Sequence, residues 1–210
     1  MPPAARGRGI APVLLAAGTS SRFEGGHKLL APLDLGDGPR PVVAHVFAAL
    51  VEAFETPPLV VLGARAAEIE AALGAPARTI RNPDHARGMG TSLAVAARAL
   101  LADGGPAPPV LLALGDMPLV NAATHRAVAG ALGPAPDAAA RATTAGTPRP
   151  RPGHPVALGP AWLERLAALD GDEGLRDALG GATVARVPVD ARTQIDVDTR
   201  DALARAASRS

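Results

Sequence analysis

Short apolar runs alternate along the chain with longer segments whose apolar positions recur every three to four residues. The short runs are typical of buried strands and the periodic segments of amphipathic helices. The predicted strands cover residues 13–16, 59–62, 77–80, 110–114, 138–143 and 183–187. The predicted helices cover residues 41–50, 64–73, 91–102, 121–132, 162–169 and 199–207. This alternation predicts an α/β fold with a mostly parallel central sheet flanked by helices.

Proline, glycine and short polar residues mark the predicted boundaries. Pro41 suits the first turn of its helix and Asn121 suits an N-cap. The proline-rich segment 147–153 cannot be helical and is predicted to be a loop. Alternation resumes after every loop. We therefore expect one domain over residues 10–207, after a flexible N-terminus of residues 1–9.

Composition narrows the possible partners. The 210 residues include no cysteine, which excludes disulfides and thiol catalysis. Three Phe, one Trp and no Tyr argue against binding of single-stranded nucleic acid by base stacking. The net charge of +1 comes without a basic stripe, and no apolar run approaches the roughly 20 residues of a membrane span. We expect a cytoplasmic protein that binds neither nucleic acid nor membranes.

A polar loop after the first strand is the strongest candidate for phosphate binding. Leu15-Ala16-Ala17-Gly18 ends the strand, and Arg22 and Lys28 follow within a Gly/Ser-rich stretch. Such a loop exposes backbone N–H groups that favour phosphate, and the two cations add charge. The spacing is neither that of a P-loop nor that of the dinucleotide fingerprint. The alternative is a tight strand–helix connection with Arg22 as an ordinary surface charge.

Carboxylates near the ends of two segments are candidate metal ligands. Asp116, in Leu114-Gly-Asp116-Met-Pro118, follows the most continuous apolar run, where α/β sheets bind ligands. Oxygen ligands suit Mg²⁺, although Asp116 could also be only a turn residue or a helix cap. Asp196-Val-Asp198 is predicted to be strand-like, with both carboxylates on one side about 7 Å apart. Such a pair needs a cation or hydrogen-bond donors nearby.

Two further segments carry candidate binding groups. Gly88-Met-Gly90-Thr91-Ser92 precedes a helix, so its free N–H groups and hydroxyls suit a ribose or a base. The simpler alternative is an N-cap by Thr91 or Ser92. His154, in Gly153-His-Pro-Val156, is predicted to lie in a loop. His45 and His125 fall within helical patterns and are expected to be structural or exposed.

Taken in order, these stretches resemble the MobA-like nucleotidyltransferases, with the branch of molybdenum cofactor cytidylyltransferases nearest. Asn82-Pro83 and Asp196-Val-Asp-Thr199 belong to the same series, and the resemblance runs from about residue 10 to residue 203. Arg22 and Lys28 are six residues apart, one more than the spacing commonest in that family. The resemblance implies a Rossmann-like nucleotidyltransferase fold.

The resemblance also implies roles for individual residues. Arg22, Lys28 and Asp116 would be catalytic; Asp116 and Asp198 would bind Mg²⁺, with Asp196 the alternative second ligand. His154 and Arg176 would bind the acceptor, although Arg176 could instead pair with Asp172. The implied nucleotide-binding residues are Leu15, Ala16, Ala17, Gly18, Arg22, Lys28, Asn82, Gly88, Gly90, Thr91 and Ser92.

The implied reaction transfers CMP from CTP to the phosphate of molybdopterin and releases pyrophosphate. The resemblance further implies transient contact with a client molybdoenzyme. Ala17 favours CTP, because guanine-using relatives typically have glycine there and a methyl group narrows the space for a purine. The alternatives are a guanylyltransferase of the same family, a sugar-phosphate nucleotidyltransferase, and a non-catalytic protein that delivers cofactor to a molybdoenzyme.

Overall fold

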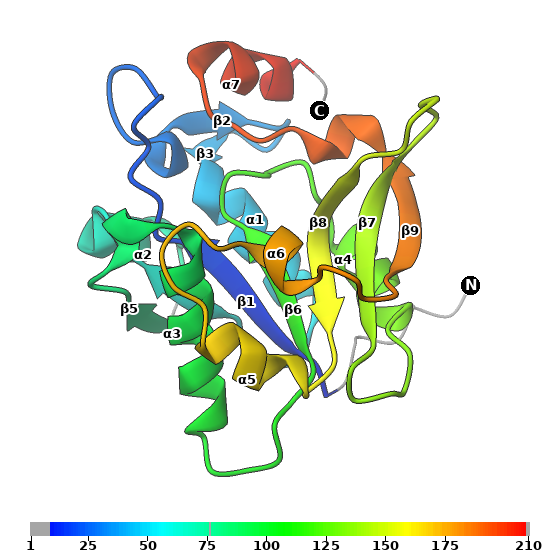
Figure 1. Ribbon diagram of the computed structural model, residues 1–210. Helices are drawn as coiled ribbons and strands as arrows, with labels where there is room; N and C mark the ends of the chain where they lie inside the picture. The colour runs from blue at the N-terminus through cyan, green and yellow to red at the C-terminus, as the bar shows by residue number, and fades with distance from the viewer. Residues whose placement is uncertain (1–8, 76, 209–210) are drawn as a thin grey trace.

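A seven-stranded sheet runs through the middle of the computed structural model, which describes residues 9–75 and 77–208 (Figure 1). Its strand order is β5-β4-β1-β6-β8-β7-β9. Only β8 among these strands is reversed, because it pairs antiparallel with both β6 and β7 while the other pairs are parallel. The predicted α/β fold with a mostly parallel sheet is confirmed.

The strands are β1 (Ala11–Ala16), β2 (Pro32–Asp34), β3 (Pro39–Pro41), β4 (Leu59–Leu62), β5 (Arg78–Arg81), β6 (Val110–Leu114), β7 (Ala139–Ala145), β8 (Pro152–Leu158) and β9 (Ala185–Asp190). The helices are α1 (Val42–Ala53), α2 (Ala66–Ala72), α3 (Met89–Leu101), α4 (Ala122–Gly130), α5 (Trp162–Ala167), α6 (Leu175–Ala178) and α7 (Arg200–Ala207). None of the helices in the described part of the chain is long and apolar enough to cross a membrane.

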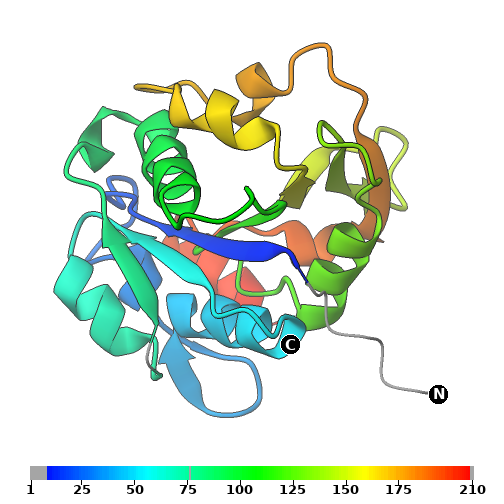
Figure 2. The same ribbon diagram turned by 90° about the horizontal axis from the view of Figure 1, so that it is seen from below.

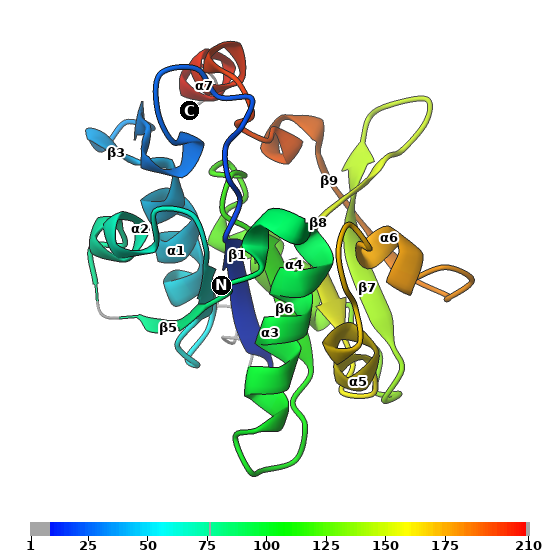
Figure 3. The ribbon, with the colours of Figure 1, turned by 60° about the vertical axis from the view of Figure 1, so that its left-hand side comes forward.

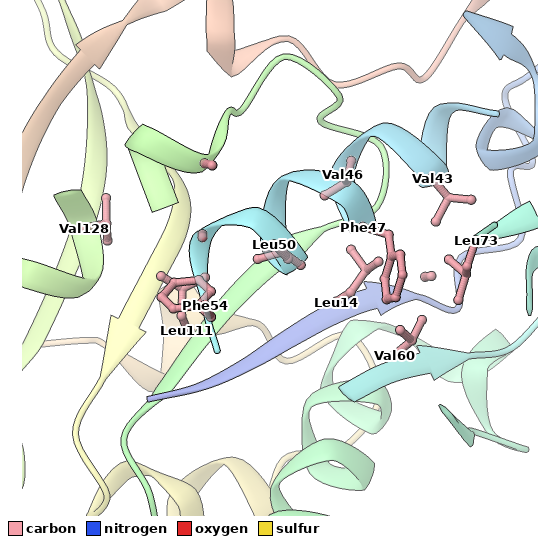
Figure 4. Close-up of a cluster of buried hydrophobic side chains, with 14 of the residues drawn as sticks. Leu14, Val43, Val46, Phe47, Leu50, Phe54, Val60, Leu73, Leu111 and Val128 are labelled. Atoms are coloured by element: carbon pink, nitrogen blue, oxygen red, sulfur yellow. The ribbon is translucent and has the colours of Figure 1, made fainter. Parts of the chain in front are cut away.

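Helices cover both faces of the sheet, with α1, α2 and α4 on one side and α3, α5 and α6 on the other, as the view from below shows (Figure 2). The two faces follow from strand alternation in β1. Leu14 packs in one cluster of buried side chains and Leu15 in the other. Figure 4 shows the first cluster, where Phe47 and Leu50 of α1 lie over Leu14.

The first predicted strand is two residues longer in the structure, and the other five agree to within three residues. Three strands and the short helix α6 were missed. Residues 32–41 form the β2–β3 hairpin, and β8 begins at Pro152, inside the stretch predicted to be a loop. The β8 prediction failed because its first residues, Pro152-Gly153-His154, are poor strand formers. Pairing of Pro152 with Thr143 of β7, and of Val156 to Leu158 with both β6 and β7, overrides that preference.

Three local predictions are also corrected or confirmed. Residues 196–198 are irregular rather than strand-like, since Asp198 N–H donates to the Asp196 carbonyl at 3.1 Å. Neither Thr91 nor Ser92 caps α3, which starts two residues earlier with Gly88 as its N-cap. Asn121 does cap α4, accepting from Thr124 N–H at 2.9 Å. Of the N-terminal segment predicted to be flexible, residues 1–8 lie outside the described residues.

The reversal of β8 decides what meets at one edge of the sheet. The register pairs Leu112 of β6 with Val156 of β8, so the carboxyl end of β6 lies beside the amino end of β8. The loops after β1 and β6 reach the same edge, because those two strands are parallel neighbours. A small third cluster, including Phe23, Leu33, Val197 and Ala206, packs α7 against β2 and the loop after β1.

Candidate active site

The Lys28 ammonium lies between two carboxylates at the carboxyl edge of the sheet. Its Nζ is 2.5 Å from Asp116 Oδ2 and 2.6 Å from Asp198 Oδ1. Arg22 reaches the other oxygen of Asp198, with Nη2 2.9 Å from Oδ2. The fold therefore gathers four predicted site residues that are up to 176 positions apart in the sequence.

Partial burial strengthens these charge interactions. Only 14% of the Lys28 side chain, 17% of Asp116 and 24% of Asp198 is exposed, whereas Arg22 is 77% exposed. Burial alone would lower the pKa of Lys28, but the carboxylates, Asp116 ahead of Asp198, outweigh it and raise that pKa. Burial opposes ionisation of Asp198, yet Lys28 and then Arg22 hold its pKa below the ordinary value.

The same carboxylates fit a hard divalent cation. Oδ1 of Asp116 is buried and has no hydrogen-bond partner, which leaves an oxygen for a metal. Asp116 and Asp198 already converge on one cationic centre, and Mg²⁺ commonly takes one or two carboxylates plus substrate phosphates. Within residues 9–75 and 77–208, no group of three or more His, Asp and Glu side chains could hold a metal.

The loop between β1 and Lys28 is closed by two hydrogen bonds across its ends. His27 Nε2 donates to the Gly18 carbonyl at 2.9 Å, and Lys28 N–H donates to Ser20 Oγ at 3.2 Å. Burial lowers the pKa of His27, although its bond to Gly18 opposes the shift. Ser20 adopts a left-handed conformation with φ of 58°. We call residues 18–28 the signature loop.

A cavity of about 340 Å³, the loop cavity, opens between the signature loop and the start of α3. Seven predicted residues line it: Leu15, Ala17, Gly18, Lys28, Gly88, Ser92 and Asp116. Sequence reasoning gave no role to the seven other residues that line it: Thr19, Leu29, His85, Ala86, Met89, Leu114 and Asp172. Met89 stood inside the motif of residues 88–92, and Asp172 was named only as a possible partner of Arg176, whereas nothing in the sequence distinguished His85.

Other residues predicted to bind nucleotide do not line this cavity. Asn82 and Thr91 form a buried network, in which Asn82 Nδ2 donates to Thr91 Oγ1 at 2.8 Å and to Ser92 Oγ at 2.9 Å. Gly90 packs against the loop after α5, donating its N–H to the Gly171 carbonyl at 3.0 Å. Ala16 points into the core on the opposite face of the sheet. These contacts hold the wall of the cavity in place.

A second cavity of about 700 Å³, the β8 cavity, shares Leu114 with the loop cavity and is also lined by Met117, the residue after Asp116. His154, Gln194 and Asp196 line it, together with Arg149 and Arg151. His154 belongs to β8 rather than to a loop; burial, and then the charge of Arg141, lower the pKa of its imidazole to about 4. Its ring is therefore neutral at pH 7, and its buried Nδ1 has no hydrogen-bond partner.

Gln194 is a residue of the β8 cavity that sequence reasoning missed. Its carboxamide hydrogen-bonds both polar main-chain groups of His154. Oε1 accepts from the His154 N–H at 2.9 Å, and Nε2 donates to the His154 carbonyl at 2.8 Å. A Cβ on Gly153 would lie 1.9 Å from Gln194 Oε1, so only glycine leaves room for this clamp. A lone glutamine at the end of a short 3-10 helix, residues Ala191–Gln194, carries no sequence signal.

The structure separates some of the residues predicted to act together. Asp198 joins Lys28 and Asp116, whereas Asp196 faces the β8 cavity. Arg176 is exposed on α6 and lines neither of these two cavities. Among the described ion pairs none joins Arg176 to Asp172.

An α/β sheet with a polar loop after its first strand and convergent carboxylates at its carboxyl edge is a fold and site suited to phosphorylated ligands. Residues 12–187 match the model of the MobA-like NTP transferase domain. The chain belongs to this family of NTP transferase domains.

Similar proteins agree with this assignment. Rv0371c from Mycobacterium tuberculosis H37Rv superposes with a TM-score of 0.75 at 28% identity, covering 96% of this chain and 99% of that one. Its complex with manganese has a TM-score of 0.72 at 26% identity, with the same coverage. A nucleotidyl transferase from Methanothermobacter thermautotroptrophicus also has a TM-score of 0.72 at 26% identity, covering 96% of this chain and 97% of that one.

Among curated relatives, the bifunctional protein GlmU of Sphingopyxis alaskensis is 36% identical over 126 residues. The match covers 59% of this chain and 26% of that protein. This chain therefore spans about a quarter of the length of that relative.

Proposed function

We propose that the chain is a Mg²⁺-dependent nucleotidyltransferase that transfers CMP from CTP to the phosphate of molybdopterin. The observation that carries the proposal is the ion-paired group of Lys28, Asp116 and Asp198. Lys28 and Asp116 line the loop cavity, and the β8 cavity is lined by Met117, next to Asp116 in the chain, and by Asp196, two positions before Asp198. The loop cavity would hold the nucleoside triphosphate and the β8 cavity the acceptor. A transferase needs such an arrangement, because both substrates must reach one set of charged groups.

In the proposed reaction an acceptor phosphate oxygen forms a bond to the α-phosphorus of the nucleotide. The bond from that phosphorus to the bridging oxygen breaks, and pyrophosphate leaves with the electron pair. A phosphate monoester is already anionic at neutral pH, so the attack requires no general base. Positioning and charge neutralisation therefore supply the catalysis.

The charged side chains divide this work. Asp116 and Asp198 would hold Mg²⁺, which when bound neutralises charge on the phosphate oxygens. Lys28 would then turn from the carboxylates to the β- and γ-phosphates, and exposed Arg22 would reach the leaving pyrophosphate. The unpartnered Oδ1 of Asp116 supports its role as a ligand.

The proposed substrates depend on two further features. Arg149 and Arg151 beside the β8 cavity suit an anionic acceptor, and the resemblance of Gly153-His-Pro-Val156 favours molybdopterin. Ala17 lines the loop cavity, and its methyl group favours the smaller cytosine over guanine.

The test is to mix protein, Mg²⁺ and α-labelled CTP or GTP with molybdopterin that carries molybdenum. A labelled dinucleotide product and release of pyrophosphate from CTP are expected. Product only from GTP would indicate the guanylyltransferase, and product only with a sugar phosphate would indicate that other acceptor class. Acceptor binding without any product would instead indicate a delivery protein.

A further inference from the structure

We propose that Arg200, the first residue of α7, is a positioning residue that fastens the signature loop so that it is ready to bind nucleotide. The effect expected on nucleotide kinetics rests on the proposed function, since it concerns Arg22 and Lys28, the side chains proposed to bind phosphate. The attachment of Arg200 to the loop rests only on the contacts in the structure. Figure 3 shows α7 beside the loop that follows β1.

The guanidinium of Arg200 makes three contacts with consecutive residues of the loop. Its Nε donates to the Glu24 carbonyl at 3.0 Å and its Nη2 to the Gly25 carbonyl at 3.3 Å. Its Cζ lies 4.7 Å from the centroid of the Phe23 ring, in cation–π contact. These three residues lie between Arg22 and Lys28 in the sequence.

The loop and the segment before α7 are tied in both directions. Arg22 reaches from the loop to Asp198, and Arg200 reaches back from two positions after Asp198 to the loop. Buried Phe23 adds an apolar contact, because it packs in one cluster with Val197. The position of Asp198 and the position of Lys28 are therefore coupled through one small interface.

The loop backbone is shaped for this approach. Gly25 has φ of +73°, a conformation that favours glycine, and a Cβ there would lie 3.2 Å from Arg200 Nη2. Arginine suits the position because its planar guanidinium can lie on a ring while donating to two carbonyl groups. Lysine cannot make all three contacts at once.

We expect the fastening to act on nucleotide binding more than on the chemical step. Without the Arg200 contacts, the loop of the free protein would adopt its binding conformation only part of the time. The apparent affinity for nucleotide is then the intrinsic affinity multiplied by the fraction of protein in that conformation. Once nucleotide is bound, its phosphates hold Lys28 and Arg22 themselves. Loss of Arg200 should therefore raise KM for the nucleotide and change kcat little.

The experiment compares Arg200→Ala and Arg200→Lys with wild type, and uses Arg205→Ala on the same helix as the matched control, since Arg205 is also exposed. Hydrogen exchange of amides 21–27 without nucleotide should quicken at least about fivefold in Arg200→Ala, with an intermediate effect in Arg200→Lys. KM for the nucleotide should rise about tenfold and kcat change less than about threefold. Arg205→Ala should match wild type in all three quantities.

Unchanged exchange in Arg200→Ala, or equal effects in Arg205→Ala, overturns the fastening. A fall in kcat as large as the rise in KM overturns the positioning role. If wild type transfers no nucleotide, the proposed function fails, and the exchange experiment alone decides whether Arg200 fastens the loop.

Discussion

Lowering the pH should destabilise the protein through His125, and replacing this residue should remove that sensitivity. His125 lies on α4 with 1% of its surface exposed, and neither ring nitrogen has a hydrogen-bond partner. Burial, with a smaller contribution from the charge of Arg126, lowers the pKa of His125 to about 3. Protonation is therefore far easier in the unfolded chain, where histidine titrates near pH 6.5.

The sign and size of the effect follow from linkage. A depressed pKa means that the unfolded chain binds the proton first, so the contribution of neutral His125 is complete above about pH 6.5 and is lost as the pH falls toward 3. At pH 5 the pH lies about 1.5 units below the pKa of histidine in the unfolded chain. Each unit costs about 1.4 kcal/mol of unfolding free energy, so the loss at pH 5 is about 2 kcal/mol.

The assay is urea unfolding followed by circular dichroism at several pH values from 7.5 to 5.0. Between those limits, His125→Met should lose about 2 kcal/mol less unfolding free energy than wild type. His125→Gln is the matched control, because it removes the titration but keeps a buried polar group. Both variants should show the same slope, smaller than that of wild type but not zero, because buried His154 also has a lowered pKa, of about 4, and still titrates. Slopes equal to that of wild type would refute the reasoning.

Three predictions test the proposed site. Asp116→Asn should keep its circular dichroism spectrum and lose at least about 100-fold in turnover; near-normal rates at saturating Mg²⁺ would contradict its role as a ligand. Lys28→Ala should weaken nucleotide binding and leave acceptor binding unchanged, as isothermal titration with each substrate separately will show; unchanged nucleotide affinity and rate would return the signature loop to a simple connection. Wild type should prefer CTP over GTP by about 10–200-fold in kcat/KM, and Ala17→Gly should narrow that ratio; equal use of both nucleotides by wild type would remove the argument for cytidylyl transfer.

The sequence predicted the elements that depend on local pattern and missed those that depend on pairing. Val110 to Leu114 is an unbroken apolar run, and it is β6 with the predicted bounds. Pro152 to Leu158 begins with proline, glycine and histidine, and it forms a strand only because β6 and β7 pair with it on both sides. Such tertiary contacts leave no trace in a short window of sequence.

The candidate site shows the same division. Lys28, Asp116 and Asp198 could be selected because their residue types and positions next to strands indicate phosphate and metal chemistry. Their mutual contacts could not be derived, since they depend on where the irregular segment 195–199 returns to the sheet. Gln194 and Arg200 could not be predicted either, because each bonds a backbone group at least 40 positions away in the sequence.

The reversed strand β8 has a consequence for how such a domain could diverge. It puts the walls of the two cavities on largely separate stretches of chain, residues 15–29 and 85–92 for the loop cavity and residues 144–154 and 191–196 for the β8 cavity. Leu114, between them, lines both. Mutations can therefore accumulate around the β8 cavity, and reshape what enters it, without altering the walls of the other cavity. The specificity of one cavity can therefore change while the other keeps its shape.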